Sequence, residues 1–396
     1  MRAGRRPASR LLQSSPRASR ARRSARPRPL RGTSVLSLAI VAAALCGVTG
    51  AAAARGPSEP RPGLEAPQAG ELRLAAAIDD ATLPPRLDSD VRARLSTSWG
   101  LRLLTQQGEM ATIRVSDAYP QDPSRVQRWA NFLGTLVHGP ELSSLTVYLA
   151  PLTEVQSLCG FAAVACYSAQ RALAVVPGED PGGGTSAEAV LAHEYGHHVA
   201  ANRVNPPWSA VDRGTKRWAS YVQVCRRTRA GELFPGAENP FQYERNPGEG
   251  FAEAYRLLNE RRAGRVETPW EVVDRSLYPD DTALALLEQD VVSPWTRNTS
   301  NVLRGSFARA GTSRRTFTTT AGLDGTLAVT LRAPARARLS LAIVDAGGRV
   351  VSRSARTRAG SATARATTTI CGARSFRLRV TRTSGSGSFQ LTVSKP

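Results

Sequence analysis

Residues 185–201, TSAEAVLAHEYGHHVAA, decide the fold of the first two thirds of this chain. Two histidines, His193 and His197, stand four residues apart, so on a helix they lie one above the other on the same face. Their ring nitrogens can then share one tetrahedral metal ion. Glu194 follows the first histidine directly and would lie beside that metal, where a carboxylate can accept a proton from bound water.

The residues around this pattern favour a helix. Thr185 followed by Glu188 predicts a capping box, and a three-glycine loop, 182–184, precedes it. Alanine, valine and leucine fill most of the positions up to the first histidine and supply helix formers and an apolar face. The whole pattern is the H-E-x-x-H arrangement of zinc hydrolases.

A catalytic zinc needs a third protein ligand and keeps its fourth position for water. A metzincin would place a third histidine six residues after His197, but Arg203 stands there. Apart from His198, which directly follows the motif and points to a different face, the other histidine is His138 in an upstream loop. A second helix that begins at Asn246 carries Glu249 and Glu253 one turn apart on one face. We expect Glu249 to be the ligand and Glu253 to orient a ligand histidine. In the alternative, Glu249 is a capping-box glutamate and Glu253 takes its place.

The two motifs, 193–197 (HEYGH) and 249–255 (EGFAEAY), resemble those of gluzincin-type metallopeptidases, among them the anthrax lethal factor catalytic domain. In that family an H-E-F-G-H helix is followed by a helix bearing E-F-F-A-E-A-F, whose first glutamate binds zinc. The resemblance implies the same role for Glu249. Residues 72–296 are also similar to secreted actinobacterial proteins with a zinc peptidase domain. Such enzymes use a tyrosine to stabilise the oxyanion, and the candidates here are Tyr243 and Tyr255.

The order of predicted elements agrees with an α+β zincin-like catalytic domain over 72–296. Strands are expected at 111–115, 145–149 and 172–176, and helices at 123–137, 185–201 and 215–225, with a broken helical stretch at 270–295. In zincin domains the last strand before the metal-binding helix is an exposed edge. A substrate backbone is expected to pair with that edge by strand addition.

Residues 297–396 change in character. Apolar residues alternate with polar ones along several short segments separated by turn signals, which predicts an all-β antiparallel sandwich. This region is similar to the pre-peptidase C-terminal domains of secreted proteases. It contains no histidine, eighteen basic residues and two acids, Asp324 and Asp345. We expect it to meet an anionic cell-envelope polymer, and we expect no nucleic-acid partner. In the alternative, the arginines reflect only a GC-rich genome.

The N-terminus predicts export. Residues 1–54 hold eleven arginines and no acid, then an apolar run at 35–48 and four alanines at 51–54. This is typical of a signal peptide with a long basic segment, cleaved near Ala54. Two alternatives stay open: the run is kept as a signal anchor, or translation starts downstream of Met1. Residues 55–71 are expected to form a flexible leader, and whether they act as a propeptide is open.

Four cysteines follow the predicted signal, an even number that favours disulfides in an exported chain. Cys159 and Cys166 bracket a short loop and are expected to join each other. That pairing would leave Cys225 and Cys371 either as a bridge between the two domains or as two free thiols.

The sequence therefore predicts a secreted zinc metalloendopeptidase. Zinc held by His193, His197 and Glu249 would carry the attacking water, and Glu194 would activate it. The alternatives are a non-catalytic zincin-like cell-surface binding protein and a zinc hydrolase of cell-wall peptides.

Overall fold

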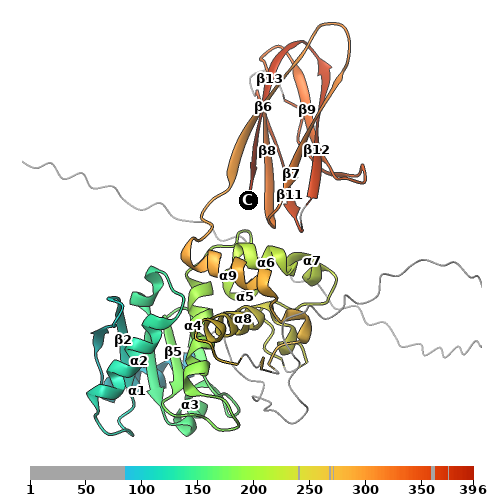
Figure 1. Ribbon diagram of the computed structural model, residues 1–396. Coiled ribbons are helices and arrows are strands. Elements are labelled where there is room, and N and C mark those ends of the chain that lie inside the picture. Colours follow the sequence, from blue (N-terminus) through green and yellow to red (C-terminus); the bar gives the residue numbers. More distant parts are fainter. Residues whose placement is uncertain (1–84, 240, 267–268, 271, 358–361, 373) are drawn as a thin grey trace, which may run out of the picture. The chain divides into compact units, whose positions relative to one another are not determined.

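A computed structural model describes residues 85–396, apart from 240, 267–268, 271, 358–361 and 373 (Figure 1). The chain divides into two compact units, Met1–Pro57 and Ser58–Pro396, and every described residue belongs to the second. The predicted signal peptide, the leader and residues 72–84 lie outside the described residues. Within the described residues, no helix is both long and apolar enough to cross a membrane.

The first domain is built on a mixed five-stranded sheet in the order β1-β2-β3-β5-β4. Strands β2, β3 and β5 run parallel, while β1 and β4 pair antiparallel at the two edges. The strands are β1 (Arg102–Leu104), β2 (Met110–Val115), β3 (Thr146–Ala150), β4 (Cys166–Ser168) and β5 (Leu173–Pro177).

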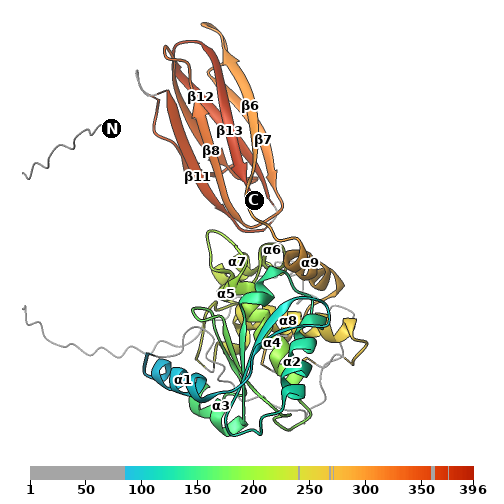
Figure 2. The same ribbon diagram turned by 90° about the vertical axis from the view of Figure 1, so that its left-hand side faces the viewer.

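Helices pack against this sheet (Figure 2). Helix α2 contacts β2, while α3 and α4 contact β5, which is buried along its whole length. The α-helices of the domain are α1 (Pro85–Thr97), α2 (Pro123–Thr135), α3 (Leu152–Cys159), α4 (Ala187–Ala201), α5 (Ala210–Arg213), α6 (Lys216–Tyr221), α7 (Val224–Arg229), α8 (Pro247–Arg262) and α9 (Asp281–Val292). Short 3₁₀ helices are η1 (Pro140–Ser144), η2 (Tyr243–Arg245) and η3 (Arg275–Leu277).

Two expectations about these elements are wrong. The strand before the motif helix, β5, lies inside the sheet, and the edge is the three-residue strand β4, which is too short to show alternation in the sequence. The single helix expected at 215–225 is two helices, α6 and α7. Gln223 separates them in the left-handed conformation, with φ of 60°, which ends the first helix.

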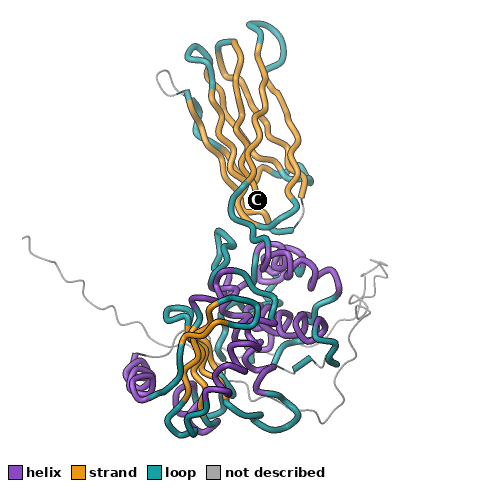
Figure 3. Tube along the Cα trace, turned by 60° about the vertical axis from the view of Figure 1, so that its left-hand side comes forward, coloured by secondary structure: helices purple, strands orange, loops and turns teal. Residues whose placement is uncertain are grey.

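The second domain is the expected antiparallel sandwich, so the predicted fold class is confirmed. Its two four-stranded sheets have the orders β10-β9-β12-β7 and β11-β8-β13-β6. Figure 3 shows that helices are confined to the first domain. The strands are β6 (Thr299–Phe307), β7 (Arg314–Ala321), β8 (Gly325–Arg332), β9 (Arg338–Val344), β10 (Val350–Arg353), β11 (Thr363–Ile370), β12 (Arg374–Ser384) and β13 (Gly387–Lys395).

Alternation along the strands builds the sandwich core. In β8, for example, Leu327, Val329 and Leu331 are buried, and the residues between them face outward. The cluster formed by such residues, which runs from Phe307 to Val393, is separate from the core of the first domain.

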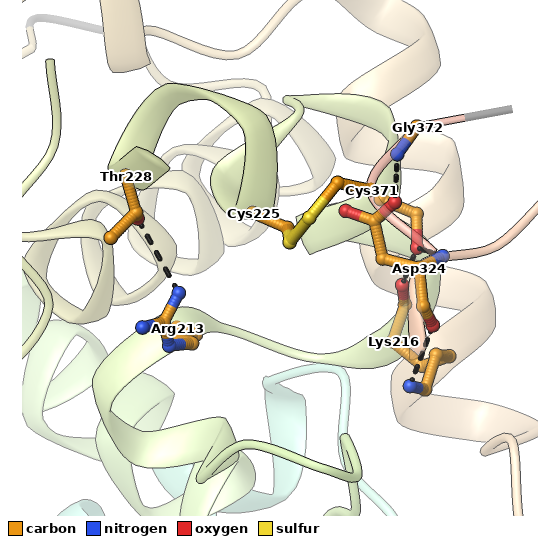
Figure 4. The surroundings of a disulfide bond; sticks show 8 residues. Arg213, Lys216, Cys225, Thr228, Asp324, Cys371 and Gly372 are labelled. Atoms are coloured by element: carbon orange, nitrogen blue, oxygen red, sulfur yellow. Dashed lines mark hydrogen bonds between the residues drawn. A yellow bond between two sulfur atoms is a disulfide. The ribbon is translucent and has the colours of Figure 1, made fainter. Parts of the chain in front are cut away.

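Both expected disulfides are present. Cys159–Cys166 joins the end of α3 to the first residue of β4 and so anchors the edge strand. Cys225–Cys371 joins α7 to the segment after β11 (Figure 4). Next to it, Lys216 Nζ donates to the carbonyl of Asp324 at 3.0 Å, and the Asp324 amide donates to Ser220 Oγ at 2.8 Å. The two disulfides agree with an extracellular location.

Candidate metal centre

Helix α4 carries the first part of the candidate site. Its N-cap is Ser186, whose Oγ accepts from the Ala189 amide at 3.1 Å. The expected cap, Thr185, is therefore one residue too early. Asp180 accepts from the Ala187 amide at 2.9 Å and satisfies another free donor of the first turn.

The second part of the site lies on α8, which packs closely against α4. The contact depends on Gly196, the fourth residue of the HEYGH motif. A Cβ atom at this position would lie 2.8 Å from the Ala252 Cα and 3.1 Å from its carbonyl oxygen. Only a residue without a side chain allows this approach, which brings the carboxylates of α8 within reach of the histidines of α4.

Three predicted ligands meet between these helices. His193 Nε2 lies 3.3 Å from Glu249 Oε2 and 3.2 Å from His197 Nε2, and His197 Nε2 lies 3.7 Å from the same carboxylate oxygen. A tetrahedral ion with bonds of about 2.0–2.1 Å sets its ligand atoms about 3.3–3.4 Å apart. The three groups can therefore hold a metal ion, and they are the one such group of histidine, cysteine and acidic side chains found among the described residues.

The capping alternative for Glu249 is not supported. In a capping box the glutamate side chain accepts from the backbone amide of the N-cap residue. Here the Asn246 amide donates to the carbonyl of Tyr243 at 2.8 Å, and the Asn246 side chain alone caps α8 by accepting from Gly248 at 3.0 Å. The Glu249 carboxylate is left to face the histidines.

Glu194 is the unusual member of the cluster. It is fully buried, and neither of its carboxylate oxygens has a hydrogen-bond partner among the described residues. Burial raises its pKa to about 8, opposed by the positive His193 and reinforced by the negative Glu249. A buried carboxylate without hydrogen-bond partners costs folding free energy, so packing alone does not explain this position.

The two ligand histidines differ in their pKa, although they share the same surroundings. Burial alone would lower the pKa of His193, but hydrogen bonds to Glu249 and Glu253 raise it to about 9. Burial lowers the pKa of His197, which keeps that ring neutral. A neutral imidazole is the form that binds a metal ion.

Glu253 lies behind the first histidine. Its Oε2 is 3.6 Å from His193 Nδ1, and Arg256 binds both of its oxygens at 2.7 and 2.9 Å. Burial would raise the pKa of Glu253, but Arg256 lowers it to about 2, so the carboxylate stays ionised. Trp270 completes the group, because its amide donates to Glu253 Oε1 at 2.8 Å and its ring stacks on His193 at 5.5 Å.

Arg256 and Trp270 are site residues that the sequence reading missed. Arg256 stands three residues after Glu253, a spacing that pairs opposite charges on a helix and could have pointed to it. Its guanidinium also lies 4.2 Å from the centre of the Trp270 ring. Trp270 comes from a loop, and no sequence signal indicates that loop's position.

The opposite face of α4 carries a second buried polar cluster. His198 Nδ1 pairs with the Tyr167 hydroxyl at 2.9 Å, and its Nε2 pairs with the Glu141 carbonyl at 2.9 Å. The Glu141 carboxylate accepts from Arg203 at 2.9 Å and from Tyr195 at 3.3 Å. His198 is therefore a structural residue, in agreement with its position one residue past the motif.

The two oxyanion candidates lie in different surroundings. The Tyr255 hydroxyl donates to the Val137 carbonyl at 2.6 Å, and its ring lies against Tyr195, toward the second cluster. Tyr243 is buried in η2, just before α8. The structure does not bring the Tyr255 hydroxyl to the metal ligands, and the oxyanion residue stays a prediction.

No family model matches this chain, and no curated protein matches it. Among solved structures, the C-terminal sandwich resembles the pre-peptidase C-terminal domain of collagenase from Bacillus anthracis. The identity is 16%, the match covers 24% of this chain and 89% of that chain, and the TM-score is 0.20. The mitogen from Yersinia pseudotuberculosis matches at 11% identity over 25% of this chain and 87% of its own, also with a TM-score of 0.20. Neither likeness bears on function.

Proposed function

We propose that this chain is a secreted zinc-dependent peptidase whose metal is held by His193, His197 and Glu249. The observation that carries the proposal is the convergence of these three buried groups at ligand spacing, with Glu194 beside them. Two imidazoles and one carboxylate form the ligand set of catalytic zinc sites in peptidases.

When bound, zinc lowers the pKa of a bound water toward about 7 and polarises the scissile carbonyl. Glu194 acts as the general base and then returns the proton to the leaving amine. Its raised pKa suits this role, because a group with a pKa near the working pH both accepts and donates a proton readily. The Glu253 carboxylate, held by Arg256 at 3.6 Å from His193 Nδ1, orients that ring through its negative charge.

The complete burial of the cluster favours a second candidate function. His193, Glu194, His197 and Glu249 are each at most 1% exposed, and catalysis requires a substrate to reach them. Closed metal sites are typical of structural ions. In this alternative the chain is a metal-stabilised, non-catalytic surface protein.

One experiment separates the two functions. The purified chain, Glu194→Gln and Glu249→Ala are analysed for bound metal and assayed for cleavage of casein and of cell-wall peptides. We expect one zinc per chain in the wild type and in Glu194→Gln, and loss of metal in Glu249→Ala. Glu194→Gln is expected to be at least a hundredfold slower than the wild type.

A chelator control tests whether turnover depends on the bound metal. A chelator should abolish turnover, and added zinc should restore it. Zinc binding without cleavage of either substrate class would support the structural alternative, whereas turnover that survives in Glu194→Gln would contradict the proposed mechanism. The protein and cell-wall assays together identify the substrate class.

A further inference from the structure

A row of polar side chains crosses the outer face of one sheet of the sandwich. Strand β13 lies between β6 and β8, and its register sets Gln390 opposite Arg304 on one side and opposite Arg332 on the other. Because neighbouring strands lie about 4.8 Å apart, the two arginines flank the amide at a separation of about 10 Å. Both arginines are exposed.

This row borders an open cavity of about 580 Å³. Besides the two arginines and Gln390, Ser306 and Ser388 line it, and Pro334 forms part of its wall. The two serines also face each other across the β6–β13 pair. The cavity thus combines two guanidinium groups with one amide and two hydroxyls, the donors and acceptors that an anionic and hydroxylated ligand requires.

The positive charge in this cavity is not neutralised by the domain. Residues 297–396 hold two acids, and both are engaged elsewhere: Asp345 pairs with Arg349 at 3.2 Å, and Asp324 accepts from the Gly372 amide. Within the described residues, neither Arg304 nor Arg332 has an ion-pair partner. A guanidinium fork binds a phosphate or carboxylate through paired hydrogen bonds.

We propose that the Arg304–Gln390–Arg332 cavity binds an extended anionic polymer rich in hydroxyls, of the polyol-phosphate class found in cell envelopes. The arginines hold two phosphate groups of one strand, and Gln390 with the serines binds the polyol between them. A polymer fits better than a lipid bilayer, because a bilayer-binding surface adds apolar side chains that enter the membrane. Among the described residues of this domain, Val302 is the one exposed large hydrophobic side chain.

The test measures binding of poly(glycerol phosphate) to the full chain by titration calorimetry. The test variant is Arg304→Gln/Arg332→Gln. The matched control, Arg353→Gln/Arg377→Gln, removes the same charge from strands β10 and β12 of the other sheet. We expect the test variant to bind at least tenfold more weakly and the control to bind within twofold of the wild type. Because the readout is binding, it is independent of the metal site.

A second pair of variants tests whether the position of an added negative charge matters. Gln390→Glu places a negative charge between the two arginines and should abolish binding, whereas Thr318→Glu, beside Arg377 on the other sheet, should not. Equal losses in the test and control variants would overturn the proposal in favour of general charge attraction. Tighter binding to vesicles of anionic phospholipid than to the polymer would assign the surface to a membrane. Absence of polymer binding by the wild type would also refute the proposal.

Discussion

Helix α4 separates two buried polar clusters that differ in how their charges are satisfied. On one face, the Glu141 carboxylate has partners for both oxygens, and both ring nitrogens of His198 are paired. On the other face, both oxygens of Glu194 have none among the described residues. Since a buried polar group without partners destabilises a fold, the two clusters differ in whether packing alone explains their polar groups. The following variants test that distinction.

The largest effect is expected from Glu141→Ala. Removing this carboxylate leaves Arg203, which is buried beside it, without its charged partner. Breaking such a pair costs about 3–5 kcal/mol, which urea unfolding of the metal-free chain would measure. The control is Glu188→Ala, whose pair with Arg265 is partly exposed and worth less than about 1 kcal/mol. Equal losses in the two variants would remove the distinction between the clusters.

Glu194→Gln should raise the free energy of unfolding, whereas Glu141→Ala lowers it. The folded-state pKa is about 8 against 4.5 for the free side chain, so between these values the unfolded state ionises while the folded state keeps its proton. Glu194 therefore lowers stability progressively as the pH rises from 4.5 to 8. The variant should be more stable than the wild type by about 3 kcal/mol at pH 7, and equally stable near pH 4. A pH series of unfolding curves on metal-free protein would show a constant difference if the prediction is wrong.

Glu253→Gln tests the support of His193. The amide keeps the size of the side chain but lowers its capacity to accept from the ring and to pair with Arg256. We expect zinc affinity to fall by about 10–100-fold, measured by competition with a chelator. Glu260 also pairs with Arg256, at 2.6 Å, but no contact with His193 is seen in the described structure, so Glu260→Gln is the control. A similar fall in both variants would mean that charge around Arg256 matters more than orientation of the histidine.

The smallest effect is expected from Gly196→Ala. A Cβ atom here would lie 2.8 Å from the Ala252 Cα, closer than such atoms approach, so the backbone of one of the two helices must shift. Overpacking of this kind costs about 1–3 kcal/mol, and we expect the loss to appear in both unfolding free energy and zinc affinity. Gly322→Ala is the control, because this glycine has no positive φ and a Cβ atom there would meet nothing within 4 Å. Unchanged zinc affinity in Gly196→Ala would show that the metal ligands tolerate a wider separation of the helices.

Most of the candidate site could be predicted from the sequence, because the position of each metal ligand follows from a short local pattern. The spacing of His193 and His197 requires only a helix, and the cap at Asn246 fixes the start of the helix that presents Glu249. The role of Trp270 could not be predicted, because its stacking on His193 joins residues 77 positions apart in the sequence. Long-range packing of this kind leaves no periodic pattern.

In the fold, too, features set by local patterns could be predicted and features set by long-range packing could not. Alternation along the sandwich strands identified that domain, since its apolar residues face one core. The edge strand β4 was missed because three buried residues show neither alternation nor length. The register that sets Arg304 and Arg332 beside Gln390 was also hidden, because pairing across strands is decided by the whole sheet.

The Cys225–Cys371 disulfide determines how proteolytic cleavage of this chain would be detected. The two cysteines are 146 positions apart in the sequence, and the largely exposed stretch 292–298 lies between them. A protease that cuts within that stretch would not release the sandwich, because the pieces would stay covalently joined. They would separate on a gel only after treatment with a thiol, so a nicked chain would retain its intact mass until it is reduced.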